Sequence, residues 1–127
     1  MIDVRGKRIY LSGPMTGKPD YNVAAFAVTH ARLKEAGADY IYDPAIRYLA
    51  LEARKAEVMT HEDYLCDCIH ELTQRKKRSQ GWETVIPMRY DMVVMLEDWE
   101  DSEGAMHEAA VADACGIPVH ELAEVLG

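Results

Sequence analysis

A continuous apolar run at residues 92–96, Met-Val-Val-Met-Leu, constrains the fold of this chain more than any other feature. A strand that faces solvent on one side alternates polar and apolar residues, whereas an unbroken short run is typical of a strand covered on both faces. Such strands occur mainly in parallel sheets, whose strands are connected by helices. We therefore expect the rest of the sequence to alternate short strands with helices.

The other segments follow this alternation. The expected strands are residues 8–12, 39–42, 92–96 and one entered through Ile117-Pro118-Val119, and the expected helices are residues 22–36, 46–57, 60–72, 102–115 and a final turn or two at 121–126. Asn22, Thr60 and either Asp101 or Ser102 are expected helix N-caps, and Gly37 is an expected C-cap. The order predicts an α/β, Rossmann-like three-layer sandwich, with a parallel sheet of four to five strands and helices on both faces. We expect residues 1–127 to form a single domain.

Composition narrows the classes of protein that this chain can belong to. No run approaches the roughly 18 apolar residues of a membrane span, and residues 1–8 lack the apolar core of a signal peptide. Three cysteines form no disulfide framework, so we expect reduced thiols and a cytoplasmic location. The formal charge of −8 makes stable nucleic-acid binding unfavourable. A basic block, Arg75-Lys76-Lys77-Arg78, is either a solvated loop or a contact surface.

The loop after the first strand is the first candidate ligand site. Ligands of parallel α/β sheets bind outside the carboxyl ends of the strands, where the loops at 12–18, 42–46 and 96–104 would meet. The first of these reads Ser12-Gly13-Pro14-Met15-Thr16-Gly17-Lys18, and its backbone N–H groups could approach an anion. It lacks the spacing of a P-loop, and a plain tight turn is an equally open interpretation.

Glu108 is the most informative single residue. At ~100° per residue its neighbours on the helix surface are all small or apolar: Gly104, Ala105, Val111, Ala112 and Cys115. Burial of a carboxylate is costly, so Glu108 should have a partner or a raised pKa. A carboxylate of this kind beside a ligand crevice is a candidate functional group. The alternative is a glutamate at the rim of the face that reaches solvent with its long side chain.

Two further residues are weaker candidates. Tyr10 lies near the carboxyl end of the first strand, where it either packs or holds a nearby carboxylate in place. Asp67 lies on the helix expected at 60–72, and a surface acid is the simpler interpretation of its spacing. The histidines show no metal-ligand spacing, so we expect no metal and no cofactor.

Several motifs recur in a fixed order and carry a resemblance to a known family. They are Ile9-Tyr10-Leu11-Ser12-Gly13-Pro14-Met15-Thr16-Gly17, Asp43-Pro44-Ala45, Asp91-Met92-Val93-Val94-Met95-Leu96, the segment from Trp99 to Glu108, and Gly116-Ile117-Pro118-Val119. Together they resemble the nucleoside 2-deoxyribosyltransferase-like superfamily, and are closest to its small phage and bacterial branch. The resemblance covers nearly the whole chain. It implies a compact Rossmann-like sheet, homodimers or higher homo-oligomers, and cleavage of N-glycosidic bonds of 2'-deoxynucleosides.

The resemblance also implies roles for individual residues. Glu108 matches the nucleophile that forms a covalent 2-deoxyribosyl enzyme, and Tyr10 matches the residue that orients this carboxylate. Asp67 is our choice for the acid that assists departure of the base. Ser102, six residues before Glu108, matches the branch that hydrolyses 2'-deoxynucleoside 5'-monophosphates. A phosphate cradle would then comprise Ser12, Gly13, Met15, Thr16, Gly17, Ser102 and Gly104.

The expected activity is therefore release of free base from a 2'-deoxynucleoside 5'-monophosphate. A base-exchanging 2-deoxyribosyltransferase, a non-catalytic nucleotide-binding module and an interaction protein that uses the basic block remain alternatives. Pro14 stands where the hydrolases often carry a phosphate-binding serine. The segment at 74–87 is longer than the usual link, and could be a lid over the base, an oligomer contact or an insertion.

Overall fold

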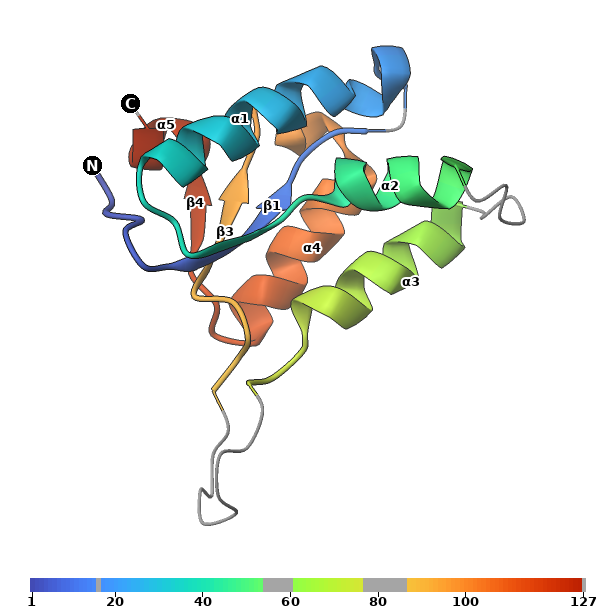
Figure 1. The fold of residues 1–127 in the computed structure, drawn as a ribbon. Coiled ribbons are helices and arrows are strands. Elements are labelled where there is room, and N and C mark those ends of the chain that lie inside the picture. Colours follow the sequence, from blue (N-terminus) through green and yellow to red (C-terminus); the bar gives the residue numbers. More distant parts are fainter. Residues whose placement is uncertain (16, 54–60, 77–86, 127) are drawn as a thin grey trace.

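The computed structural model describes residues 1–15, 17–53, 61–76 and 87–126 of the chain (Figure 1). Its helices and strands follow the order β1 (Arg8–Ser12), α1 (Val23–Glu35), β2 (Tyr40–Tyr42), α2 (Pro44–Ala53), α3 (His61–Leu72), β3 (Met92–Met95), α4 (Glu103–Ala114), β4 (Val119–Glu121) and α5 (Leu122–Leu126). Short 3-10 helices, η1 (Pro19–Asn22) and η2 (Trp99–Asp101), precede α1 and α4. No helix in the described ranges combines the length and apolar character needed to cross a lipid bilayer.

The described strands form one parallel sheet in the order β2-β1-β3-β4. The register pairs Tyr10 with Val93 and Ser12 with Met95 at the centre of the sheet. From β1 the chain moves outward to β2, then returns across the sheet to β3 and moves outward again to β4. The order of connections therefore reverses between β1 and β3, which is where open parallel sheets bind their ligands.

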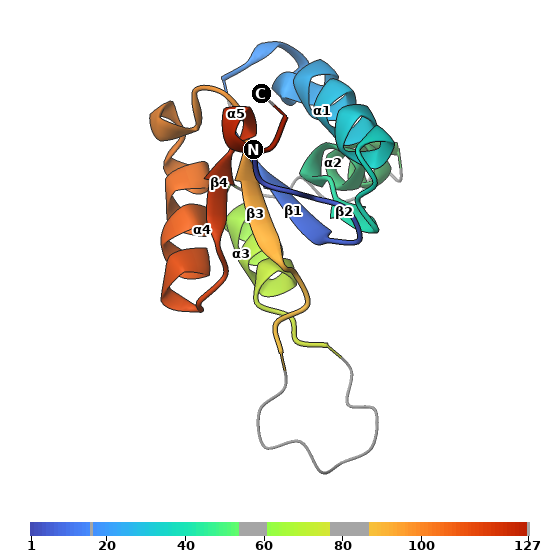
Figure 2. The same ribbon diagram turned by 90° about the vertical axis from the view of Figure 1, so that its left-hand side faces the viewer.

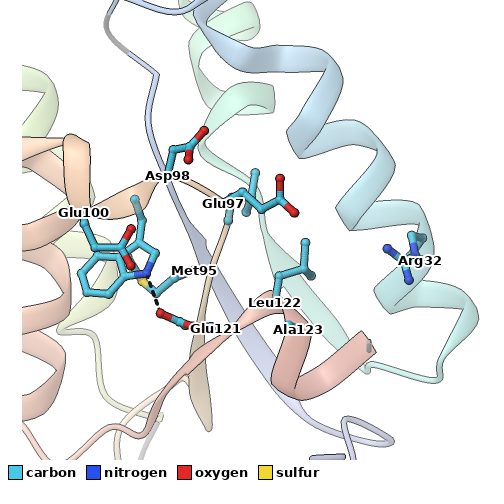
Figure 3. A pocket seen from close by; sticks show the side chains of 10 residues that line it. Arg32, Met95, Glu97, Asp98, Glu100, Glu121, Leu122 and Ala123 are labelled. Carbon is cyan, nitrogen blue, oxygen red and sulfur yellow. Dashed lines mark hydrogen bonds between the residues drawn. The ribbon is translucent and has the colours of Figure 1, made fainter.

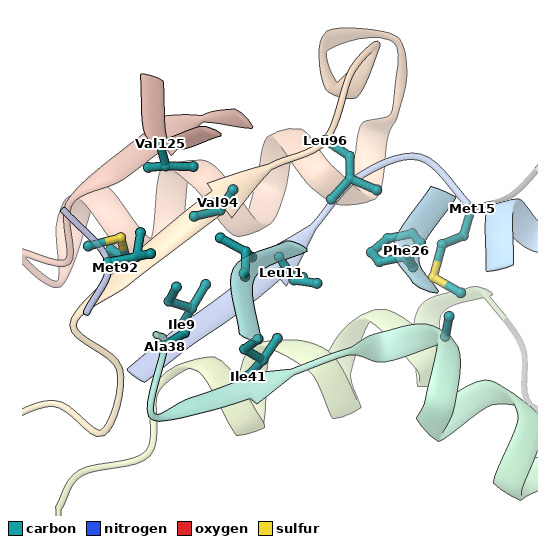
Figure 4. Packing of buried hydrophobic residues seen from close by; sticks show 13 residues of the cluster. Ile9, Leu11, Met15, Phe26, Ala38, Ile41, Met92, Val94, Leu96 and Val125 are labelled. Atoms are coloured by element: carbon teal, nitrogen blue, oxygen red, sulfur yellow. The ribbon is translucent and has the colours of Figure 1, made fainter. Parts of the chain in front are cut away.

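Helices cover both faces of this sheet, as the sequence predicts (Figures 1 and 2). One apolar core joins β1, β2 and β3 to α1, α2 and α5 (Figure 4), and a second joins the opposite face to α3 and α4. Side chains of β1 alternate between the two cores, since Ile9 and Leu11 enter the first and Tyr10 the second. The predicted α/β Rossmann-like three-layer sandwich is confirmed.

Two predicted helix starts differ in detail. The second helix begins at Pro44 rather than Ile46, because the Asp43 carboxylate accepts the backbone N–H of Ala45 at 2.9 Å and proline suits a first helical turn. Asn22 occupies the N-cap position of α1, but its amide donates to Pro14 O at 2.9 Å and does not cap the helix. The predicted cap Thr60 and the predicted end of α2 lie outside the described residues.

The described ends of the segment at 74–87, residues 74–76 and Pro87, lie at the amino end of the sheet (Figure 2). The base of this segment is a short antiparallel pairing, in which Lys76 N donates to Pro87 O at 2.9 Å and Arg89 N to Gln74 O at 2.8 Å. This base lies just before β3, at the edge of the sheet opposite the carboxyl ends of the strands. Residues 77–86 lie outside the described part of the chain, so a lid, a contact or an insertion stays a prediction.

Candidate functional site

The carboxyl ends of the two central strands are tied together. The backbone N–H of Leu96, just after β3, donates to the carbonyl of Ser12 at 2.8 Å. Lys18 and Asp98, from the two loops that follow, form an ion pair of 3.6 Å on the surface. The loops after β1 and β3 are therefore neighbours at the point where the order of the sheet reverses.

Gly13 lets these two loops approach closely. A Cβ atom at this position would lie 2.8 Å from Cβ of Leu96, closer than real side chains come, so no larger residue fits without movement. Gly17 in contrast has open space around it and a φ of +83°, which is the ordinary reason for glycine in a turn. Packing and turn geometry thus account for both glycines, and leave their predicted role in binding an anion as a prediction.

Glu108 is buried in the second core, on the face of α4 that meets the sheet. The residue is 8% exposed, and Ala105 and Ala112 on the same face of the helix are buried with it. Tyr10 and Ser12, two residues apart on β1, present their hydroxyls to this carboxyl group. The prediction that Glu108 breaks the amphipathic pattern by pointing inward is confirmed.

Burial raises the pKa of Glu108 from 4.5 to about 7, because the charged form loses its hydration. The hydroxyls of Tyr10 and Ser12 act in the opposite direction to the extent that they donate to the carboxylate, because only a donated hydrogen favours its charged form. Both the protonated and the charged form of Glu108 are therefore accessible near neutral pH. A carboxyl group in this state can serve as a nucleophile, a base or an acid.

The hydroxyl of Tyr10 is committed to another partner. It donates to the backbone carbonyl of Cys68 on α3 at 3.1 Å, and the ring stacks on Tyr42 with centroids 5.0 Å apart. Burial and the neighbouring Glu108 raise the pKa of Tyr10 well above its usual value. In the described part of the chain, neither Ser12 Oγ nor Glu108 Oε2 has a partner at hydrogen-bond distance and angle.

Ser102 begins the helix that carries Glu108. Its hydroxyl oxygen accepts the backbone N–H of Ala105 at 3.2 Å, so the N-cap is Ser102 rather than Asp101. Because the hydroxyl accepts in this contact, its own hydrogen stays available for a ligand. Gly104, half-buried, follows in the first turn, where backbone N–H groups point out of the helix end.

Asp67 lies on α3 but its carboxylate turns toward α2. It accepts two hydrogen bonds of 3.2 Å from Arg47, one on each oxygen. Its charge acts on the hydroxyl of Tyr42, whose ring in turn stacks on Tyr10. Asp67 is thus connected to Tyr10 through the ring of Tyr42, and its own hydrogen bonds are to Arg47.

For two residues of the predicted phosphate cradle, Met15 and Thr16, the described part of the structure shows no side chain that is placed to bind phosphate. The side chain of Met15 packs into the first core beside Phe26 (Figure 4). Thr16 lies outside the described residues. The predicted cradle is therefore represented by Ser12 and Gly13 at the end of β1, by Gly17 further along the loop, and by Ser102 and Gly104 at the start of α4.

The sequence interpretation did not identify Asp43, just after β2, as a helix cap and a partner of a histidine. Its buried carboxylate caps α2 through Ala45 N and contacts His30 Nδ1 at 3.0 Å. An aspartate directly before a proline at a helix start was the available signal, because such a residue combines an N-cap with a favourable first turn. The contact with His30 on α1 has no signal in the sequence.

A separate pocket of about 310 Å³ lies beside the carboxyl ends of β3 and β4 (Figure 3). Glu97, Asp98 and Glu100 line it together with Arg32 of α1 and residues of α5. Trp99 Nε1 donates to Glu121 Oε1 across it at 3.3 Å. The predicted site residues do not line this pocket, so it is distinct from the Glu108 site. Within the described ranges, no three His, Cys, Asp or Glu side chains are grouped to hold a metal ion.

Comparison with known proteins gives one match. A family model described as "Domain of unknown function (DUF4406)" matches residues 7–121. The matched range begins just before β1 and ends with β4, so it includes the whole sheet together with Tyr10, Ser12, Ser102 and Glu108. No curated protein and no solved structure matches the chain.

Proposed function

This chain belongs to the DUF4406 family, and we propose that it is an enzyme that cleaves the N-glycosidic bond of 2'-deoxynucleoside 5'-monophosphates. One observation carries the proposal: Glu108 is buried at the carboxyl end of β1, against two hydroxyls, on a helix whose first turn is capped by Ser102. A carboxylate and an anion-binding helix end on the same element suit a substrate that joins a reactive sugar carbon to a phosphate.

Glu108 would act as the nucleophile. A charged carboxylate oxygen attacks C1' of the sugar, the bond from C1' to the base nitrogen breaks, and the base leaves with the electron pair and takes up a proton. Water then attacks C1', the ester bond to Glu108 breaks, and deoxyribose 5-phosphate is released. Positive charge develops on the sugar in both steps, and a carboxylate in a water-poor site stabilises it more strongly than one in water.

Departure of the base needs a proton donor, and Asp67 remains our candidate. Its carboxylate accepts two hydrogen bonds from Arg47, and its charge acts on Tyr42, whose ring stacks on Tyr10. In this role Asp67 would have to leave Arg47 when substrate enters. The pair is partly exposed, and such pairs contribute only about 0–1 kcal/mol, so its opening costs little.

The phosphate would bind at the start of α4. The hydrogen of the Ser102 hydroxyl and the unpaired N–H groups of the first turn would donate to phosphate oxygens, and the helix dipole favours negative charge there. Acidic residues of the preceding loop would oppose a dianion if they faced it. Asp98 instead pairs with Lys18, while Glu97 and Glu100 line the pocket beside α5 (Figure 3).

The resemblance to the nucleoside 2-deoxyribosyltransferase-like superfamily supports the same proposal through Tyr10, Ser102 and Glu108. It also leads us to propose that the protein acts in the cytoplasm as a homodimer or higher homo-oligomer. The base, and the choice between water and a second base as acceptor, are outcomes of the following experiment.

Chromatographic release of free base tests the proposal. The four deoxynucleoside 5'-monophosphates are incubated with the protein beside the matching deoxynucleosides and ribonucleotides, with and without an acceptor base. We expect release from at least one deoxynucleoside monophosphate without an acceptor, and a loss of at least 1,000-fold in Glu108→Gln. Glu103→Gln is the matched control, since Glu103 is exposed on the same helix.

Other results would overturn the proposal in distinct ways. Exchange seen only with an acceptor base would make the protein a transferase. Recovery of bound, intact nucleotide without release would make it a binding module. Equal release by the parent and Glu108→Gln would remove Glu108 from the reaction.

A further inference from the structure

Two hydroxyls face Glu108, and they are not equivalent. Tyr10 is fully buried, its ring is stacked on Tyr42, and its hydroxyl donates to the carbonyl of Cys68 at 3.1 Å. A phenol has one hydrogen, so while this bond exists Tyr10 can only accept a hydrogen bond from Glu108. An acceptor pairs with the protonated acid and gives nothing to the charged carboxylate that attacks a sugar.

Ser12 is the other hydroxyl, and its hydrogen is uncommitted. The residue is 1% exposed, and its Oγ has no hydrogen-bond partner among the described residues. Glu108 Oε2 is buried and equally without a partner in that part of the structure. A buried hydroxyl and a buried carboxylate oxygen that lack other partners each carry a desolvation cost, and a bond between them removes both costs.

The backbone of Ser12 is fixed where this bond needs it. Its carbonyl accepts Leu96 N at 2.8 Å, and the residue pairs with Met95 in the register of the sheet. The side chain has a single rotatable bond before the hydroxyl, so a change of rotamer is enough to aim the hydrogen. Val93 and Met95 of β3 belong to the same apolar core as Tyr10 of β1 and Ala105 of α4.

We propose that Ser12 is the positioning residue of Glu108: its hydroxyl donates to Oε2 of the charged carboxylate and leaves the second oxygen free to attack the sugar. This inference rests on the proposed function, and it takes Ser12 out of the predicted phosphate cradle. Tyr10 then accepts a hydrogen bond from the protonated form of Glu108 and donates none to the charged form. After the attack, Oε2 is the carbonyl oxygen of the ester and still accepts the hydrogen bond from Ser12. When water releases the sugar, the same hydrogen bond again stabilises the charged carboxylate.

The test compares Ser12→Ala with Tyr10→Phe by two independent measurements. Infrared difference titration, with Glu108→Gln as the reference, reports the pH midpoint of the Glu108 carboxyl in the protein without substrate. The pH profile of base release reports the same group during turnover. We expect Ser12→Ala to raise the midpoint by about one pH unit or more and to lower kcat at pH 7 about tenfold with little change in KM.

Tyr10→Phe should move the midpoint less than Ser12→Ala does, and Ser12→Thr, which keeps the hydroxyl, should restore the parent midpoint. Ser12→Cys, a weak donor of similar size, should fall between Ser12→Ala and the parent. An unchanged midpoint in Ser12→Ala, or a larger shift in Tyr10→Phe, would overturn the inference. Absence of base release in every variant would overturn the proposed function instead, because the infrared midpoint does not depend on turnover.

Discussion

The backbone N–H of Leu96 donates to the carbonyl of Ser12 at 2.8 Å, and this contact joins the loops that follow the two central strands. Gly13 lies against the side chain of Leu96 at the same place. The position of Ser12 relative to Glu108 therefore depends on how closely the end of β1 approaches the end of β3. Packing at one glycine is thus linked to the geometry of the proposed nucleophile.

Substitution of Gly13 tests this link. Gly13→Ala should destabilise the protein by about 1–3 kcal/mol, because the new methyl group meets Leu96 Cβ at 2.8 Å and the loops must separate. The shift should also lower kcat for base release. Gly6→Ala is the control, because Gly6 has open space and a positive φ but lies before β1, and it should cost about 1–2 kcal/mol with kcat retained. Denaturant unfolding and turnover are measured together, and an unaltered kcat in Gly13→Ala would break the link.

Burial of Glu108 should make the stability of the protein depend on pH. Its pKa in the folded state is about 7, above the usual 4.5, so the folded state favours the protonated form. The associated stability is complete below pH 4.5 and is lost as pH rises through 7, by about 3 kcal/mol in total. Glu108→Gln removes this titration.

The free energy of unfolding of Glu108→Gln should therefore rise by about 3 kcal/mol relative to the parent between pH 4 and pH 8. Urea unfolding at several pH values measures this difference, and other titrating groups cancel in the comparison. Glu103→Gln, which removes an exposed acid of the same helix, is the control. A constant offset for Glu108→Gln across this pH range would contradict the prediction.

The capping and phosphate-binding roles of Ser102 can be separated. Asparagine, aspartate and serine cap helices about equally, so Ser102→Asp should leave stability within about 0.5 kcal/mol of the parent. The added negative charge should repel a phosphate dianion and raise KM for monophosphates at least tenfold, or about 1.4 kcal/mol. KM for deoxynucleosides should not rise. A similar rise of KM for both kinds of substrate would place the phosphate elsewhere.

The role of Asp67 can be distinguished from its ion pair. Asp67→Asn should lower kcat by about 100- to 10,000-fold if this acid protonates the departing base. Arg47→Gln breaks the same two hydrogen bonds but keeps the carboxyl group, so it should retain most of kcat. Both variants should change stability by less than about 1 kcal/mol. Equal losses of kcat in the two variants would make Asp67 a partner of Arg47 and nothing more.

Much of the fold could be predicted from the sequence because it depends on patterns of residues that are close in the chain. The unbroken run at 92–96 predicts a strand buried on both faces, and the spacing around Glu108 predicts an inward carboxylate on α4. Both predictions are confirmed by the burial of β3 and of Glu108. The sequence limits the N-cap of α4 to Asp101 or Ser102, and the hydrogen bond from Ala105 N identifies it as Ser102.

Contacts between residues that are far apart in the sequence could not be predicted from it. Tyr10 and Cys68 are 58 positions apart, and nothing in the strand that carries Tyr10 indicates that its hydroxyl is already engaged. The pairing of Asp67 with Arg47 depends on how α2 and α3 pack. Asn22 had the residue type of a cap, but Pro14 O competes for its amide. In each case a polar group has several possible partners, and tertiary packing selects one.

Trapping of the covalent intermediate tests the central claim most directly. A 2'-deoxy-2'-fluoroarabinonucleoside 5'-monophosphate carries an electronegative substituent that slows release of the sugar from the enzyme, and peptide mass spectrometry then locates the modified residue. The account predicts a 2-deoxy-2-fluoroarabinosyl 5-phosphate adduct on Glu108 of the parent and none on Glu108→Gln. Base release from the same compound without an adduct, or an adduct on another residue, would contradict the assignment of Glu108 as the nucleophile.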